Sequence, residues 1–253
     1  MAIDIQIVCE IARQAGEKIM EIYDGDHVVE FKDDKSPLTA ADKASHAVIV
    51  TGLTKHYPEI PILSEEGKDI PYEQRKNWSR FWLVDPLDGT KEFIKRNGEF
   101  TVNIALIEKN EPTLGVVYVP AQGKVYHGIK FQGAFLQQGS ENPYPIQVRM
   151  TPPVEGLTVV MSRSHPSPEL EEYLKDIKVA EALPVGSSLK LCVVAEGKAD
   201  LYPRLGPTME WDTAAGHAVV TAAGGTVETP DGKLLKYNKE NLLNPFFIVK
   251  NTL

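Results

Sequence analysis

The chain has 253 residues, of which 42% are hydrophobic, enough to bury a sizeable core as one large domain or two smaller ones. Its 35 acidic and 27 basic residues give a formal net charge of −8, which argues against nucleic acid or acidic lipid as partners. No stretch reaches membrane-spanning length, and the first 20 residues are amphipathic and carry acids. We therefore expect no signal peptide and no transmembrane helix, and a cytoplasmic location.

Two helices are predicted at the start of the chain. From Ile5 to Ile22 apolar residues recur three or four apart, which predicts a helix with one stripe on the core. The segment 36–42 opens a second predicted helix, with Thr39 as N-cap and Asp42 three residues later, the spacing of a capping box. On this spacing alone, capping is favoured for Asp42 over a catalytic role.

An acidic turn follows the first predicted strand. Residues 60–63 have the apolar pattern of a short buried strand, which runs directly into Ser64, Glu65, Glu66 and Gly67. A solvated acidic turn is the favoured interpretation, because charge pairs after a strand are usually exposed. The alternative is that one of the two acids turns inward.

The run from Trp82 to Lys91 contains the most closely spaced candidate functional residues. Its apolar lead-in predicts the end of a buried strand, which would deliver Asp85 to a strand's carboxyl end, where ligand sites concentrate. Pro86 restricts the backbone around it, and a tight turn could bring Asp88 to the same cation or to a neighbouring one. The carbonyl of Leu87 would be a further oxygen ligand.

The same run also offers an anion site. Gly89 permits a special dihedral angle, and the N–H groups of Gly89 and Thr90 could point at a phosphate if a helix begins there. Taken by itself, the stretch is more typical of a strand followed by a plain Pro-Asp-Gly turn. Other parts of the chain are needed to decide between the two.

The pattern of predicted secondary structure changes near the middle of the chain. Strands predicted at 100–107, 114–119, 125–129 and 134–136 form an antiparallel meander. The segment 137–145, rich in Gly, Ser, Asn and Pro, is the candidate boundary between an N-terminal α+β part, 1–145, and a C-terminal α/β part, 146–253. In the second part strands and helices alternate. Strands are predicted at 157–161, 183–185, 199–202, 225–228 and 246–249, and helices at 168–177, 186–196 and from about 212 to 223.

Two helix starts in the second part carry polar side chains. At Ser187, an anion site and a plain serine N-cap are equally compatible with the sequence. Asp212 precedes a run of small residues, where it is either an N-cap or a metal ligand beside the positive end of the helix. Cys9 and Cys192 are expected to be small buried residues. The six histidines lack the paired spacing of a zinc helix, so an oxygen-only site would favour Mg²⁺ or a similar hard cation.

Three separated motifs resemble those of the inositol monophosphatase superfamily of magnesium-dependent, lithium-sensitive phosphatases. They are 85–90 (Asp-Pro-Leu-Asp-Gly-Thr), 64–66 (Ser-Glu-Glu) and 211–216 (Trp-Asp-Thr-Ala-Ala-Gly), in the family's order over nearly the whole chain. The resemblance implies a layered sandwich of alternating α and β layers, the sugar phosphatase fold. Segments 91–94, 186–190 and 202–207 are similar to the bacterial CysQ branch, the 3′(2′),5′-bisphosphate nucleotidases.

The resemblance also implies a set of metal ligands. Glu65, Asp85 and the Leu87 carbonyl would bind one Mg²⁺, and Asp85 would bridge to a second Mg²⁺ bound by Asp88 and Asp212.

Further roles follow from the same resemblance. Thr90, backed by Asp42, would orient and deprotonate the attacking water, with Glu65 assisting through a third, weaker metal. The N–H groups of Gly89 and Thr90 would hold the phosphate.

The substrate implied is a phosphorylated nucleotide. Inositol-type relatives carry an acid near Arg204, whereas this chain has a cation there, with Lys190 expected nearby and Ser187 as a further contact. A second phosphate suits such a pair. The expected reaction removes the 3′-phosphate of adenosine 3′,5′-bisphosphate, and the sulfated analogue is a further candidate substrate.

The alternatives are an inositol or sugar phosphatase and a non-catalytic sensor of nucleotides or metal. Monomer and homodimer remain open, as does peripheral association with the cytoplasmic face of the inner membrane.

Overall fold

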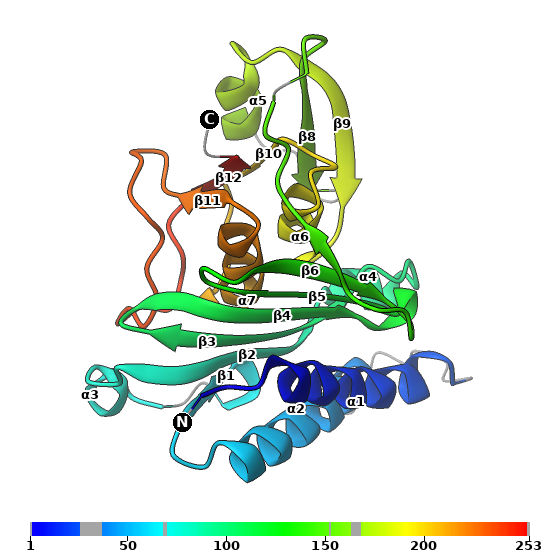
Figure 1. Ribbon diagram of the computed structural model, residues 1–253, viewed down its shortest axis with the longest axis vertical. Helices are drawn as coiled ribbons and strands as arrows, with labels where there is room; N and C mark the ends of the chain where they lie inside the picture. Colours follow the sequence, from blue (N-terminus) through cyan, green and yellow to red (C-terminus); the bar gives the residue numbers. More distant parts are fainter. Residues whose placement is uncertain (1, 26–36, 68–69, 152, 163–167, 252–253) are drawn as a thin grey trace.

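The computed structural model describes residues 2–25, 37–67, 70–151, 153–162 and 168–251, and it arranges them in alternating layers of helix and sheet (Figure 1). Helices α1 (Ile5–Tyr23) and α2 (Pro37–His56) cover the outer face of a large sheet. Helices α6 (Leu189–Ala195) and α7 (Glu210–Ala222) lie between that sheet and a smaller one, and α5 (Pro168–Leu174) packs on the far side of the smaller sheet. The predicted layered fold is confirmed.

The large sheet contains the predicted meander. Its seven strands follow chain order, and only β1 and β2 pair in parallel. The strands are β1 (Ile62–Ser64), β2 (Arg80–Asp88), β3 (Thr101–Glu108), β4 (Glu111–Val119), β5 (Lys124–Ile129), β6 (Gly133–Gln138) and β7 (Tyr144–Ile146). The sequence did not predict β7, because a short edge strand tolerates the proline and turn residues that indicated a boundary. The division of the chain at 137–145 stays a prediction.

The small sheet is built from the second half of the chain. Its order is β11-β12-β10-β8-β9, with β8 parallel to both β9 and β10 and the other pairs antiparallel. The strands are β8 (Leu157–Ser162), β9 (Val179–Val185), β10 (Leu201–Arg204), β11 (Gly225–Glu228) and β12 (Phe247–Asn251). Strand β9 begins earlier than predicted, since the exposed residues of this edge strand carry no apolar alternation.

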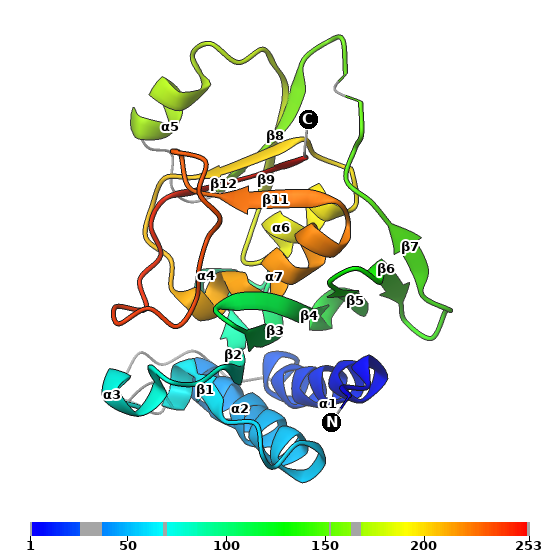
Figure 2. The same ribbon diagram turned by 60° about the vertical axis from the view of Figure 1, so that its left-hand side comes forward.

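Short helices complete the connections. They are α3 (Tyr72–Arg75), α4 (Thr90–Ile94) and the 3₁₀ turns η1 (Glu65–Gly67) and η2 (Pro120–Gln122). Figure 2 shows α1 and α2 side by side beneath the large sheet, and the segment after β11 descending toward that sheet before the chain returns as β12. Among the described helices, none has both the length and the apolar character of a membrane span.

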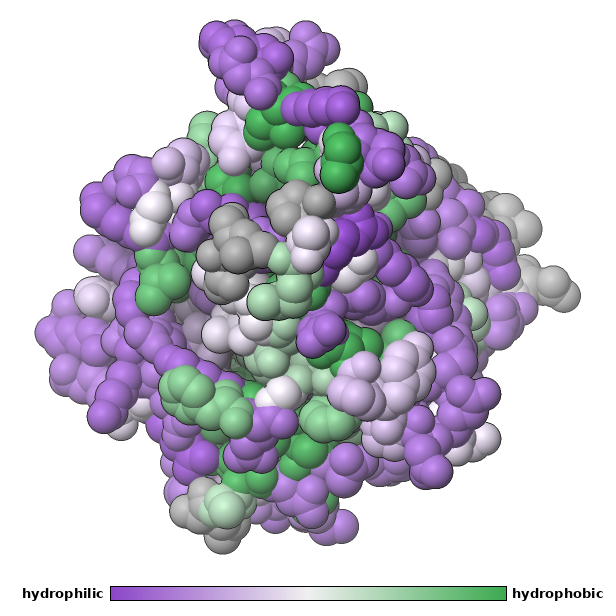
Figure 3. Space-filling model, turned by 45° about the horizontal axis from the view of Figure 1, so that its top comes forward, coloured by the Kyte–Doolittle hydropathy of each residue, from purple (hydrophilic) through white to green (hydrophobic). Residues whose placement is uncertain are grey.

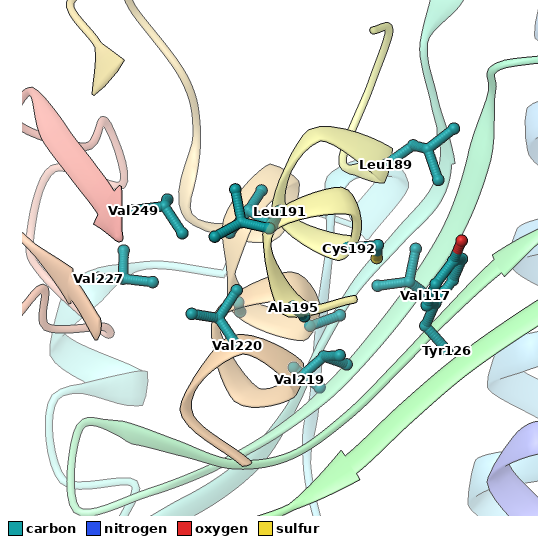
Figure 4. Close-up of a cluster of buried hydrophobic side chains, with 14 of the residues drawn as sticks. Val117, Tyr126, Leu189, Leu191, Cys192, Ala195, Val219, Val220, Val227 and Val249 are labelled. Atoms are coloured by element: carbon teal, nitrogen blue, oxygen red, sulfur yellow. The ribbon is translucent and has the colours of Figure 1, made fainter. Parts of the chain in front are cut away.

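The main core lies between the two sheets. Figure 4 shows Val117 and Tyr126 of the large sheet on one side of α6, and Val227 and Val249 of the small sheet on the other. Cys192 is fully buried in this layer, and it and Cys9 are both free thiols, as predicted. The surface in Figure 3 is mostly hydrophilic with scattered hydrophobic areas, as expected for a protein that buries its apolar side chains internally.

The predicted N-cap at Thr39 is wrong, and so is the N-cap alternative for Asp212. Helix α2 begins at Pro37, so Thr39 is its third residue instead of its N-cap; a proline at the first helical position already has the required φ angle. Residue 36 lies outside the described residues. Helix α7 begins at Glu210, so Asp212 is its third residue, and its carboxylate accepts the N–H of the N-cap residue Met209 at 2.8 Å. In both cases, a helix that begins earlier than predicted shifts the capping position.

Candidate active site

The predicted site residues converge on one cavity of about 270 Å³. Its lining comes from η1, the end of β2, the start of α4, the segment before α6, α6 itself, β10 and α7. The lining residues are Glu65, Asp85, Leu87, Asp88, Gly89, Thr90, Lys91, Glu92, Ser187, Lys190, Arg204 and Asp212. Of the residues predicted to form the site, Asp42 alone is outside this lining set.

Strand β2 delivers the first two carboxylates through an irregularity in its ladder. Asp85 pairs with Asn103 on β3 and Asp88 pairs with Thr101, so β2 carries an extra residue between the two acids. The sequence predicted that the strand ends near residue 84, whereas β2 continues to Asp88. A bulge of this kind re-aims side chains, which lets both acids reach the cavity from the same strand.

Gly89 makes the turn into α4. Its φ is +100°, a conformation that side chains rarely adopt, and a Cβ placed there would lie 3.1 Å from the Cα of Phe100. Helix α4 then begins at Thr90, as the predicted phosphate-binding turn requires. The motif is therefore a bulged strand end followed by a helix, and the plain turn favoured by its local pattern is not what forms.

Three carboxylates gather at the base of the cavity. Asp85, Asp88 and Asp212 each offer an oxygen, and these oxygens lie within 4.8 Å of one another. One oxygen of each carboxylate also accepts a backbone N–H. The donors are Leu87 for Asp85 at 3.1 Å, Ser188 for Asp88 at 2.6 Å and Met209 for Asp212 at 2.8 Å. A carboxylate held through one oxygen can present the second to a cation.

Burial and mutual repulsion oppose ionisation of the carboxylates in this cluster. Burial, followed by the charge of Asp88, raises the pKa of Asp85 well above its ordinary value. The same two causes raise the pKa of Asp212 to about 8. Clustered oxygen donors that repel one another in this way fit a hard divalent cation such as Mg²⁺, which would supply the missing positive charge.

Glu65 and Glu66 leave β1 toward different neighbours. Glu65 lines the cavity, and its charge contributes to the raised pKa of both Asp85 and Asp212. The inward alternative for the acidic turn is therefore the correct one for Glu65. Glu66 lies close enough to Asp42 to raise the pKa of that carboxyl group.

Asp42 lies behind the carboxylate cluster. Burial first, and then the charges of Glu66 and Glu65, raise its pKa to about 7. Its Oδ1 is buried and has no hydrogen-bond partner among the described residues. Its charge reaches Asp85, which places it near the site, while the predicted contact with Thr90 stays a prediction.

The lining of the cavity also includes two cations, Lys190 and Arg204. Lys190 is only 9% exposed, and burial lowers the pKa of its ammonium group, an effect that the charge of Asp88 opposes. Arg204 donates from Nη2 to the carbonyl of Pro207 at 2.8 Å, which orients its guanidinium. The two cations also line an adjoining cavity of about 80 Å³ with Tyr202, so they lie together as expected.

Sequence reasoning missed several residues of the site. Ser188 contacts Asp88 directly, whereas the neighbouring Ser187 donates its hydroxyl to the carbonyl of Glu99 at 2.5 Å. The sequence signal for this contact was the pair of serine hydroxyls at a helix start. No local pattern shows which of the two serines faces Asp88, which is 100 residues away from Ser188 in the sequence. Lys91 and Glu92, which directly follow the motif, also line the cavity.

Comparison with known proteins agrees with this geometry. The model of the inositol monophosphatase family matches residues 4–250. A 3′(2′),5′-bisphosphate nucleotidase CysQ of Salmonella typhimurium is 53% identical over 249 residues, which cover 97% of this chain and 98% of that protein. The protein of the same name from Escherichia coli K12 is 53% identical over 247 residues, 96% of this chain and 97% of the relative.

Solved structures give the same result. The crystal structure of CysQ from Bacteroides thetaiotaomicron superimposes with a TM-score of 0.89 at 44% identity, covering 98% of this chain and 97% of that one. An inositol monophosphatase from Anabaena superimposes with a TM-score of 0.74 at 27% identity, covering 97% of this chain and 89% of that one. The chain belongs to the inositol monophosphatase family.

Proposed function

We propose that this protein is a metal-dependent phosphatase that hydrolyses the 3′-phosphate of adenosine 3′,5′-bisphosphate to give AMP and phosphate. One observation carries the proposal: a single cavity is lined both by a carboxylate cluster and by the cations Lys190 and Arg204. The first suits a metal-bound phosphate and the second a further phosphate of the same molecule. The bisphosphate nucleotidase names of the relatives at 53% identity support the same reaction.

The carboxylates would hold the metal. In this proposal Glu65, Asp85 and the Leu87 carbonyl bind one Mg²⁺, and Asp85, Asp88 and Asp212 bind a second, with a third, weaker one near Glu65. When bound, such cations lower the pKa of a water molecule and neutralise the leaving oxygen. The protein's part is to keep one oxygen of each aspartate fixed by a backbone N–H, so that the ligand set is largely formed beforehand.

Proton transfer is assigned to Thr90 and Asp42. The hydroxyl of Thr90, at the start of α4, would orient the attacking water and accept its proton. Asp42, whose pKa of about 7 lets it hold or release a proton near neutral pH, would take the proton onward. The N–H groups of Gly89 and Thr90, which begin a helix, would hold the phosphate oxygens.

Substrate choice is assigned to Ser187, Lys190 and Arg204. A buried ammonium group and a guanidinium oriented by a carbonyl favour a second phosphate, and a monophosphorylated inositol has no group for them. The sulfated analogue of the nucleotide keeps the 3′-phosphate and an anionic 5′ substituent, and we include it as a second substrate. A sensor without catalysis would not need Thr90 beside the metal ligands.

A substrate panel tests the proposal. Phosphate release is measured with Mg²⁺ for adenosine 3′,5′-bisphosphate, its sulfated analogue, inositol 1-phosphate and fructose 1,6-bisphosphate, with EDTA as the control. We expect the highest kcat/KM for adenosine 3′,5′-bisphosphate and no release in EDTA. Preference for inositol 1-phosphate would replace the proposal by an inositol phosphatase. No release from any substrate by folded, metal-loaded protein would favour the sensor.

A further inference from the structure

Ser188 contacts both Asp88 and Asp212, two acidic residues that come from different halves of the chain. Its Oγ lies 2.7 Å from Oδ2 of Asp88 and 2.6 Å from the backbone carbonyl of Asp212. Its N–H donates to the same Oδ2 of Asp88 at 2.6 Å. The residue is 2% exposed, so these contacts are screened from water.

The side chain of Asn103 orients this serine. Its Nδ2 donates to Ser188 Oγ at 2.8 Å, and Asn103 itself is 1% exposed. Because that lone pair of Oγ is occupied, the serine proton is directed to Asp88 Oδ2 or to the Asp212 carbonyl. In either case Oδ2 of Asp88 remains held by the serine N–H, and the other oxygen can face a cation.

The contacts cross the layers of the fold. Asp88 ends β2 and Asn103 lies on β3 of the large sheet, whereas Ser188 precedes α6 and Asp212 stands in the first turn of α7. The distance between Asp88 and Asp212 therefore depends on how the helix layer sits on the sheet. Ser188 is the residue that bonds to both sides of this junction.

A purely stabilising role explains these contacts poorly. Oδ1 of Asn103 is buried and has no hydrogen-bond partner among the described residues, which costs free energy. The two carboxylates also repel each other, as the effect of Asp88 on Asp212 indicates. Here a buried amide oxygen lacks a partner, and two acids that repel each other are held at a fixed separation. Such local strain is typical of a site that is preorganised for a ligand.

We infer that Ser188, oriented by Asn103, is a positioning residue that sets the spacing of Asp88 and Asp212 and so the affinity for a cation shared by these two carboxylates. The inference rests on the proposed function only in that it assumes a cation at this cluster. It adds two residues that the metal-ligand set and the substrate contacts do not include.

Mn²⁺ binding to substrate-free protein, followed by electron paramagnetic resonance, is the direct test. Ser188→Ala is expected to weaken one Mn²⁺ site by about 10- to 100-fold, and Ser188→Thr, which keeps the hydroxyl, to restore most of the affinity. Asn251→Ala is the matched control, because it also removes one buried hydrogen bond, from Asn251 Nδ2 to the Arg149 carbonyl at 2.8 Å, in the small sheet. It should lower the melting temperature without changing Mn²⁺ affinity.

Turnover gives a second readout. For Ser188→Ala, the Mg²⁺ concentration for half-maximal rate should rise by about the same factor as the Mn²⁺ dissociation constant, while kcat at saturating Mg²⁺ falls much less. If Ser188→Ala does not fold, Asn103→Leu decides: it removes the donor to Ser188 Oγ and is expected to weaken the same Mn²⁺ site by a smaller factor.

The outcomes separate this inference from the proposed function. Wild-type Mn²⁺ affinity in folded Ser188→Ala, or in Asn103→Leu where that variant decides, overturns the inference even if the protein hydrolyses the bisphosphate nucleotide. Wild-type protein that binds Mn²⁺ but hydrolyses none of the panel refutes the function, and weakened Mn²⁺ binding in Ser188→Ala then still supports the inference. Failure of the wild-type protein to bind Mn²⁺ overturns the inference.

Discussion

Glu210 and Asp212 stand two residues apart on the first turn of α7, but their surroundings are opposite. Glu210 is completely buried and accepts the N–H groups of Asn238 at 2.6 Å and Lys239 at 2.9 Å. The ammonium group of Lys239 lies 2.6 Å from the same carboxylate. Asp212 faces Asp88 instead, and its pKa rises to about 8.

The contrast separates an acid that holds the fold from one that we propose binds a cation. Glu210 ties α7 to the segment after β11, and Arg75 of α3 secures the same segment through Asn238 Oδ1 at 3.0 Å and the Lys239 carbonyl at 2.7 Å. Glu210 is the more deeply buried of the two, so depth of burial does not mark the acid that lines the cavity. What differs is the neighbouring charge: Glu210 pairs with the Lys239 ammonium group, whereas the repulsion of Asp212 by Asp88 exceeds the attraction of Arg204.

Removing one acid from the unpaired cluster should give the largest effect. We expect Asp88→Asn to lower kcat by about 10³-fold or more, because a cation ligand and its charge are lost while the side-chain volume is kept. Phosphate release from adenosine 3′,5′-bisphosphate measures this, and circular dichroism checks the fold. Rates equal to those of the wild-type protein would contradict the assignment of the metal site.

Glu210→Ala should affect stability in the first place. It leaves the Lys239 ammonium and two N–H groups without their acceptor, so we expect the free energy of unfolding to fall by about 3–5 kcal/mol. Urea denaturation measures the loss. Asp212→Asn is the matched control, because it removes a repelled carboxylate and should not destabilise the metal-free protein. An equal loss in both variants would remove the distinction drawn between the two acids.

The unpaired cluster should also give the metal-free protein an unusual pH dependence. The pKa of Asp212 in the folded state is raised to about 8, so between about pH 4 and pH 8 the folded state holds a proton that the unfolded state has released. The contribution of this group to the free energy of unfolding is therefore complete below about pH 4 and is lost as the pH rises through about 8. The slope is at most about 1.4 kcal/mol per pH unit for each proton. Urea denaturation in EDTA between pH 6 and 8 measures it, and Asp212→Asn should flatten it. A slope unchanged in that variant would contradict the prediction.

The smallest effect concerns the cationic side of the cavity. Arg204→Ala should lower the ratio of kcat/KM for adenosine 3′,5′-bisphosphate over inositol 1-phosphate by about tenfold, since one charge-assisted contact to the second phosphate is lost. Initial rates with both substrates give the ratio. An unchanged ratio would mean that Arg204 does not read the second phosphate.

Local patterns in the sequence predicted much of this molecule. The acids of the 85–90 motif and the turn at Gly89 lie close in the chain, so covalent geometry already restricts where they point. The resemblance of separated motifs then indicated the family and the layered fold, and both are confirmed. The assignment of individual roles within the site remains a set of predictions.

What the sequence missed depends on contacts between distant segments. Thr39 was predicted as an N-cap, and Asp212 was left as either an N-cap or a metal ligand. Both are the third residue of a helix that begins earlier, because cap-forming residues can stand equally well two positions inside a helix. The choice between Ser187 and Ser188 depends on the rotation of the segment before α6 against β2 and β3. Tertiary packing determines where a helix begins and which serine faces the site, and local sequence patterns do not contain this information.

The close fit of α7 on the large sheet extends the constraints on catalysis far from the cavity. A Cβ at Gly115 would lie 2.2 Å from the Ala215 carbonyl, and one at Gly128 would lie 2.8 Å from the Cβ of Ala222. Any larger residue at either glycine must push α7 away from the sheet, and Asp212 would move with the helix. We therefore expect substitutions at Gly115 or Gly128 to disturb the proposed metal site as well as the packing of α7, although neither glycine lines the cavity.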